Sequence, residues 1–174
     1  SDIAIMDFSG TEAIPFLTAI LGLDINKLTA SGLGLRSSLD DDLTSSYAYA
    51  LYYFNETAFR FVLGKDASVQ LQSLINEQQL RYDIDYVMRD DLSALTLSGE
   101  QAFDALVDSF KLTPGLRLSD MRSCYGAQSG EVFITAIDNQ ATQQFQLVAR
   151  QAELDKWQTH LQQLGFDLAL ANVA

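Results

Sequence analysis

Residues 3–22 read IAIMDFSGTEAIPFLTAILG, and residues 92–110 read LSALTLSGEQAFDALVDSF. Each stretch starts with a short apolar run that ends in Ser-Gly. Apolar residues then follow at the i, i+3, i+4 spacing of a helix with one buried face. Pro15 is tolerated only in the first turn of a helix, which places the start of the first helix near Thr11. The same strand, Ser-Gly and helix unit therefore occurs twice.

The segments that follow each unit are also repeated. Counterparts differ by 89 positions at first, as in Ser9 and Ser98, and by 86 after the long connection, as in Phe59 and Phe145. A three-residue difference in the connections explains the change of offset. Alternation and turn residues predict strands and helical spacing predicts helices. The predicted segments are strands over 47–54, 58–63 and 82–86 with a helix over 67–80, then strands over 131–137, 143–149 and 166–170 with a helix over 151–164.

Each half is thus predicted to follow the order β-α-β-β-α-β, with long connections over 26–43 and 111–129. An antiparallel sheet with helices packed on one face would bury each apolar stripe. The expected fold class is α+β, with two related halves that have antiparallel sheets and helices packed on them. We expect residues 1–88 to form the first subdomain and residues 89–174 a second, ferredoxin-like subdomain.

The composition excludes several partners. The 174-residue chain has 11 basic and 23 acidic residues, a formal net charge of −12, so it is an acidic protein. Nucleic acid and anionic membrane surfaces attract basic proteins, and neither is an expected partner, although a local basic pocket is compatible with this charge. A single cysteine allows no internal disulfide, and the N-terminus lacks the pattern of a signal peptide. We expect a cytoplasmic protein.

Isolated reactive residues give weak indications of chemistry. Cys124 lies near Arg122, and nearby cations favour a thiolate, but a small buried residue is the better interpretation. His160 lies in a predicted helix, with no Ser or Cys in a motif that would make it a general base. The consecutive acids 40–42 lack the alternation of a cation-binding loop, so we expect no metal.

The aromatic run over 47–54 permits two interpretations. Its rings could stack on a flat heterocycle, or they could pack into the core of a sheet, and packing is favoured from the run alone. A cleft between two related halves is nevertheless a suitable place for a ligand of pterin size.

Several segments resemble one family. SGTEAIPFLTAILGLDINKL and LSALTLSGEQAFDAL are similar to the two strand, glycine and helix segments of glycine cleavage T-proteins, which are aminomethyltransferases, and of their YgfZ-type relatives. NQATQQFQLVARQAELDKWQTHLQQLG is similar to a later strand and helix unit of the same folate-binding domain. The resemblance covers nearly the whole sequence, but the C-terminal barrel domain of the family has no counterpart in it.

The sequence departs from this family at the positions that carry its chemistry. Where the family has a catalytic Asp in its G-G-x-x-D-D turn, Tyr47 aligns, and Asp42 reaches that place only if the loop is shifted. Where the family has a folate-clamping Glu, Thr142 aligns, while Phe145 keeps the family's Phe. Because a carboxylate must manage the proton during transfer, these losses argue against aminomethyl transfer.

The resemblance implies a folate- or pterin-binding domain with tetrahydrofolate as its cofactor. The residues expected at the ligand are Tyr47, Tyr49, Thr142 and Phe145 in the cleft, with Arg117 or Arg122 pairing the glutamate tail. One alternative is an active one-carbon transferase of aminomethyltransferase type, with Asp42 as its weak catalytic candidate. Another is a non-catalytic subunit with a protein partner, like the gamma subunit of sarcosine oxidase.

Overall fold

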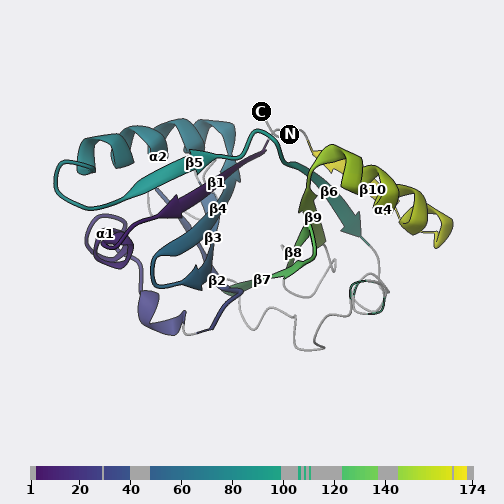
Figure 1. Cartoon of the computed structure of the whole chain (residues 1–174), viewed down its shortest axis with the longest axis horizontal. Helices are drawn as coiled ribbons and strands as arrows, with labels where there is room; N and C mark the ends of the chain where they lie inside the picture. The colour runs from purple at the N-terminus through teal and green to yellow at the C-terminus, as the bar shows by residue number, and fades with distance from the viewer. Residues whose placement is uncertain are drawn as a thin grey trace.

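A computed structural model describes residues 3–28, 30–39, 48–98, 106, 108, 110, 123–136, 145–165 and 167–171. Within these residues the chain alternates strands with helices that lie on the outer sides of the molecule (Figure 1). The strands are β1 (Ile3–Ser9), β2 (Leu33–Ser38), β3 (Ala48–Asn55), β4 (Ala58–Gly64), β5 (Asp85–Met88), β6 (Ser93–Ser98), β7 (Ser123–Ser129), β8 (Val132–Ala136), β9 (Phe145–Ala149) and β10 (Asp167–Ala171). The helices are α1 (Ala13–Ala19), the 3-10 helix η1 (Ile25–Lys27), α2 (Lys65–Gln78) and α4 (Gln151–Gln163).

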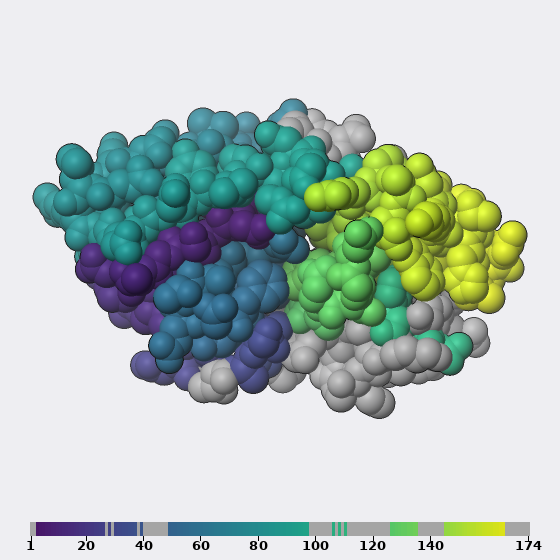
Figure 2. Space-filling model, in the orientation of Figure 1, coloured from purple at the N-terminus to yellow at the C-terminus, as the bar shows by residue number. Residues whose placement is uncertain are grey.

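The described strands form one continuous antiparallel sheet in the order β10-β6-β9-β8-β7-β2-β3-β4-β1-β5. Each half contributes five neighbouring strands. From the two edges inward, the order β5-β1-β4-β3-β2 of the first half corresponds to the order β10-β6-β9-β8-β7 of the second. The two halves join where β2 pairs with β7. In Figure 2 the first half, in purple to teal, lies directly against the green strands of the second half. The predicted α+β class with two related halves is confirmed, although their strands form one sheet.

The strand registers carry the same internal repeat as the sequence. Asp7 lies opposite Arg60 in the pairing of β1 with β4, and Thr96 lies opposite Gln146 in the pairing of β6 with β9. Thr96 follows Asp7 by 89 positions and Gln146 follows Arg60 by 86, which are the offsets read from the sequence. The halves therefore correspond residue by residue at these strands. A division into subdomains 1–88 and 89–174 stays a prediction, with its boundary in the connection between β5 and β6.

Three predicted segments differ from the structure. The connections over 26–43 and 111–129 each contain a strand, β2 and β7, that the sequence pattern does not reveal. These strands are short and contain small and polar residues, and part of their pairing comes from each other across the middle of the sheet. The strand predicted over 82–86 is displaced to Asp85–Met88, because Asp83 instead holds the turn after β1 through hydrogen bonds with Thr11.

The sheet of the first half is buried on both faces. On β1, Met6 and Phe8 belong to a cluster beneath α1 and α2, whereas Ile5 belongs to a cluster shared with the second half. Successive residues of a strand point to opposite faces, which explains this division. Tyr52 and Phe133 meet in the shared cluster with ring centroids 5.2 Å apart. The halves thus pack through a common apolar interior.

Candidate ligand site between the two halves

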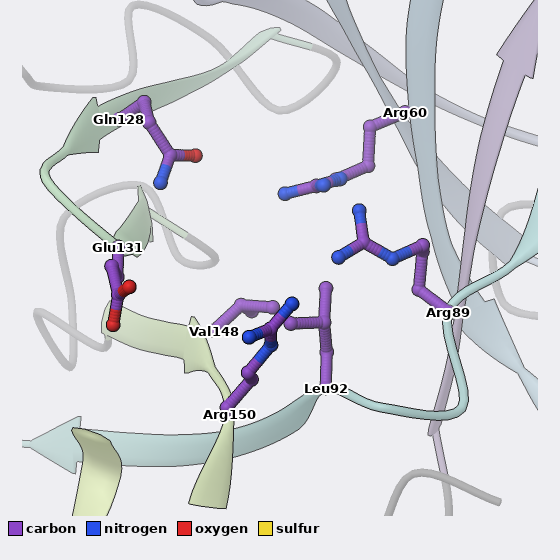
Figure 3. Close-up of a pocket in the computed structure, with 7 residues that line it drawn as sticks. All are labelled: Arg60, Arg89, Leu92, Gln128, Glu131, Val148 and Arg150. Atoms are coloured by element: carbon purple, nitrogen blue, oxygen red, sulfur yellow. The ribbon is translucent and has the colours of Figure 1, made fainter. Parts of the chain in front are cut away.

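A cavity of about 270 Å³ lies between the halves (Figure 3). Its walls come from β4, from the connection between β5 and β6, from β7 and the turn after it, and from the end of β9. Figure 3 shows the guanidinium groups of Arg60 and Arg89 entering it from one side and that of Arg150 beside the apolar side chains of Leu92 and Val148. The described residues that line it are Arg60, Arg89, Leu92, Gln128, Glu131, Val148 and Arg150.

Arg60 is fixed by the strand register. It lies opposite Asp7, and two cross-strand hydrogen bonds join them: Arg60 Nε donates to Asp7 Oδ1 at 2.7 Å and Nη2 donates to Oδ2 at 3.1 Å. The Arg60 side chain is only 9% exposed. Its Cζ atom lies 5.0 Å from the ring centroid of Phe133 and 5.6 Å from that of Phe54, within the range of cation–π attraction. This guanidinium is therefore held in place before any ligand arrives.

Arg89 ties the connection between the halves to β1 of the first half. Its Nη1 donates to Asp7 Oδ2 at 2.8 Å, while its Nε and Nη2 donate to the two carboxylate oxygens of Asp91 at 3.0 Å each. Its backbone N–H donates to the Ile5 carbonyl, also at 2.8 Å. With every guanidinium nitrogen engaged, Arg89 organises the wall of the cavity.

Arg150 approaches the cavity from the second half. It is the residue immediately before α4, and no side-chain hydrogen bond caps that helix. Its side chain is 70% exposed, and its Nε lies 3.7 Å from Asp91 Oδ2, which is beyond hydrogen-bond distance. The first backbone N–H groups of a helix carry positive partial charge, so α4 adds to the positive potential near Arg150.

The carboxyl groups of this network are ionised at neutral pH. Burial alone would raise the pKa of Asp7, but the hydrogen bonds and charges of Arg60 and Arg89 outweigh it and hold that pKa below its usual value. The hydrogen bonds from Arg89 are the main cause that lowers the pKa of Asp91 to about 2. Hydrogen bonding to Asp91, followed by the contacts with Asp7, raises the pKa of Arg89. The cavity therefore keeps its guanidinium charges in any physiological buffer.

Neither of the two described residues that the sequence predicts at a ligand, Tyr49 and Phe145, lines this cavity. Tyr49 is buried in the cluster beneath α1 and α2, with its ring 5.4 Å from that of Phe61, and Phe145 is buried in the cluster of the second half. Their predicted role at a ligand is not tested by these positions and stays a prediction. The remaining candidates lie outside the described residues; they are Asp42, Tyr47, Arg117, Arg122 and Thr142.

The structure also locates the isolated reactive residues Cys124 and His160. Cys124 lies in β7 opposite Gly34. His160 is an exposed residue of α4 whose ring meets that of Trp157 edge-on, with centroids 5.7 Å apart. Among the described residues, no three His, Cys, Asp or Glu side chains gather in a way that would hold a metal ion, and the acids 40–42 lie outside them. No helix in the described ranges is long and apolar enough to cross a membrane.

Sequence analysis missed the three arginines of the cavity. Asp7 and Arg60 each interrupt an apolar strand, and the repeat aligns them with Thr96 and Gln146, a neutral pair at the same register. The available signal was therefore a pair of oppositely charged residues on two predicted apolar strands, at positions where the second half has neutral residues. Arg89 and Arg150 lie just after strands and carry no such pattern.

The fold of this chain is similar to that of a glycine cleavage T-protein. The chain is similar to the crystal structure of glycine cleavage system aminomethyltransferase T from Bartonella henselae, with a TM-score of 0.66 and 16% sequence identity. The match covers 88% of this chain and 42% of that protein, so this chain spans less than half of its length. No protein-family profile matches the sequence. At this identity the similarity establishes the fold.

Proposed function

We propose that this chain is a folate- or pterin-binding domain that does not itself transfer aminomethyl groups. The observation that carries the proposal is an arginine-lined cavity between the halves of a T-protein fold. Folates bear carboxylates on their glutamate end, and guanidinium groups are the side chains best suited to bind carboxylates in a planar, bidentate manner.

The cavity fits one end of a folate. Its volume of about 270 Å³ is just below the range for sites that hold a whole organic ligand, about 300–1,000 Å³. Its described lining has three arginines but no aromatic side chain on which a pterin ring would stack. The carboxylate end therefore fits the described cavity, and the ring would bind outside this lining.

The proposal that transfer chemistry is absent rests on the sequence. Tyr47 and Thr142 align where the family has its two functional carboxylates, and neither side chain can serve as a carboxylate acid–base group. In the described cavity, Glu131 is the only acidic lining residue. We place the chain in one-carbon metabolism as a folate-binding component.

Isothermal calorimetry with tetrahydrofolate tests the binding. We expect saturable one-site binding in the micromolar range, about 8 kcal/mol. Calorimetry is preferable to the fluorescence of Trp157, because this residue of α4 packs on Phe110 and does not line the cavity. If the folded protein shows no binding heat at millimolar ligand, the proposal is contradicted and a non-catalytic scaffold subunit is favoured. That alternative would then be tested by a search for a stable heteromeric complex.

An aminomethyl-transfer assay tests the second half of the proposal. We expect tetrahydrofolate to bind without turnover. Turnover that disappears in Asp42→Asn, with binding unchanged, would instead establish an active aminomethyltransferase-type enzyme.

A further inference from the structure

We infer that the arginine cavity is a carboxylate-binding subsite in which Arg60 and Arg150 contact the ligand and Arg89 is a positioning residue. As the place for the glutamate end of a folate, the subsite rests on the proposed function. As a site for a small organic carboxylate, it rests on the residues of the cavity alone.

The charge of the cavity lining contrasts with that of the chain. The chain has 11 Lys and Arg residues and a formal net charge of −12. Three of its arginines nevertheless line one cavity, and the single acidic residue among the described lining is Glu131. Arginine heads repel one another, so bringing three of them together costs free energy unless anions compensate. Asp7 and Asp91 compensate the charges of Arg60 and Arg89, and neither carboxylate is a lining residue, so the described lining itself is positive.

The hydrogen bonds divide the three arginines into two roles. Arg89 has each guanidinium nitrogen bonded to a carboxylate of the protein. Arg60 uses Nε and Nη2 for Asp7, and its Nη1 has no acceptor among the described residues. Figure 3 shows the tip of Arg60 pointing into the cavity. The guanidinium of Arg150 makes no hydrogen bond within the described part of the chain and has only the long contact of 3.7 Å to Asp91. Donors for a ligand therefore remain on Arg60 and Arg150.

The surroundings favour a carboxylate over a phosphate. Leu92 and Val148 form an apolar floor, which suits the carbon chain of an organic acid. Glu131 lies on the wall opposite Arg60 and Arg89 and would repel a phosphate, which concentrates its charge on one group, more strongly than a dicarboxylate, whose two charges lie on separate groups. Arg60 is preorganised by Asp7 and two aromatic rings, so a ligand does not have to order it on binding. A short dicarboxylate, as found at the end of folate, meets these conditions.

Calorimetry with three probes tests the inference on the whole chain. The probes are glutarate, tetrahydrofolate and a tetrahydropterin that lacks the glutamate end. Arg150→Gln is the main variant, because this exposed side chain has little role in folding. Arg81→Gln is the matched control, an exposed arginine outside the cavity lining. Arg60→Lys keeps a charge but loses the planar fork, and a urea titration confirms that it is folded.

We expect Arg150→Gln and Arg60→Lys each to weaken glutarate and tetrahydrofolate binding by about tenfold, about 1.4 kcal/mol. Arg81→Gln should leave both unchanged, and the affinity for the tetrahydropterin should be the same in all four proteins. If glutarate binds with this arginine dependence but tetrahydrofolate does not bind, the subsite stands for a free carboxylate and the folate proposal fails. If tetrahydrofolate binds equally well to all the variants, the folate proposal stands and this subsite is wrong.

Discussion

Replacing Asp7 by Asn should destabilise the chain by leaving a buried cation without its counter-ion. The Arg60 side chain is 9% exposed, and Asp7, at 30% exposed, accepts two of its hydrogen bonds and one from Arg89. Removing one partner of a buried ion pair costs about 3–5 kcal/mol. We expect the lower end, about 3 kcal/mol, because Asp7 is partly hydrated and Arg89 retains Asp91.

Urea denaturation measures this loss. With a slope of about 2 kcal/mol per molar urea, the unfolding midpoint should fall by about 1.5 M. Asp90→Asn is the matched control, since it removes the same charge from an exposed residue of the connection after β5. A midpoint for Asp7→Asn that equals the control's would refute the view that the ion pair holds the wall of the cavity.

A double variant separates charge from packing. Asp7→Leu with Arg60→Met replaces the pair by apolar side chains of similar size, and such replacements of buried ion pairs are often neutral or stabilising. The double variant should therefore be more stable than Asp7→Asn. If it is less stable than the single variant, the loss comes from packing and the uncompensated charge is not the cause.

The fold gives three further expectations. Stability should fall as the pH drops from about 5 to about 2, because the lowered pKa values of Asp7 and Asp91 contribute full stability above the ordinary carboxyl pKa near 4, and this is lost as the pH falls from there through the lowered values; acid titration at low salt should show this, and a flat profile would refute it. Gly10→Ala should cost at least 1–3 kcal/mol in urea, since φ is +147° and the new Cβ would lie 2.1 Å from a backbone oxygen, and an unchanged midpoint would contradict this geometry. Gly126→Ala should cost about 1–3 kcal/mol, because its Cβ would lie 2.3 Å from Phe133 Cζ, and adding Phe133→Leu should reduce the extra cost; additive losses would argue against this clash.

Much of the fold follows from the sequence because the buried stripes repeat. The 89- and 86-residue offsets relate Asp7 and Arg60 to the cross-strand pair Thr96 and Gln146, so the internal repeat and the strand registers agree. Strands β2 and β7 could not be predicted, because their partners include each other and neither has a local apolar pattern. Such pairing becomes visible only when the two halves are placed together.

The candidate site was less predictable than the fold. Tyr49 at a ligand stays a prediction, based on the stacking of aromatic side chains on heterocycles, and in the structure the residue lies in the core of a strand buried on both faces. The arginines of the cavity come from separate connections and strands, and only the folded chain brings Arg60, Arg89 and Arg150 together. The acidic composition of the whole sequence also gives no indication that positive charges gather at one site.

The folate-binding role of the cavity can be tested with a crystal structure of the chain grown with saturating tetrahydrofolate. We predict the folate between the two halves, with its glutamate carboxylates within hydrogen-bond distance of Arg60 and Arg150. Folate bound elsewhere, or no folate in a crystal grown at that concentration, would contradict a folate-binding role for the cavity.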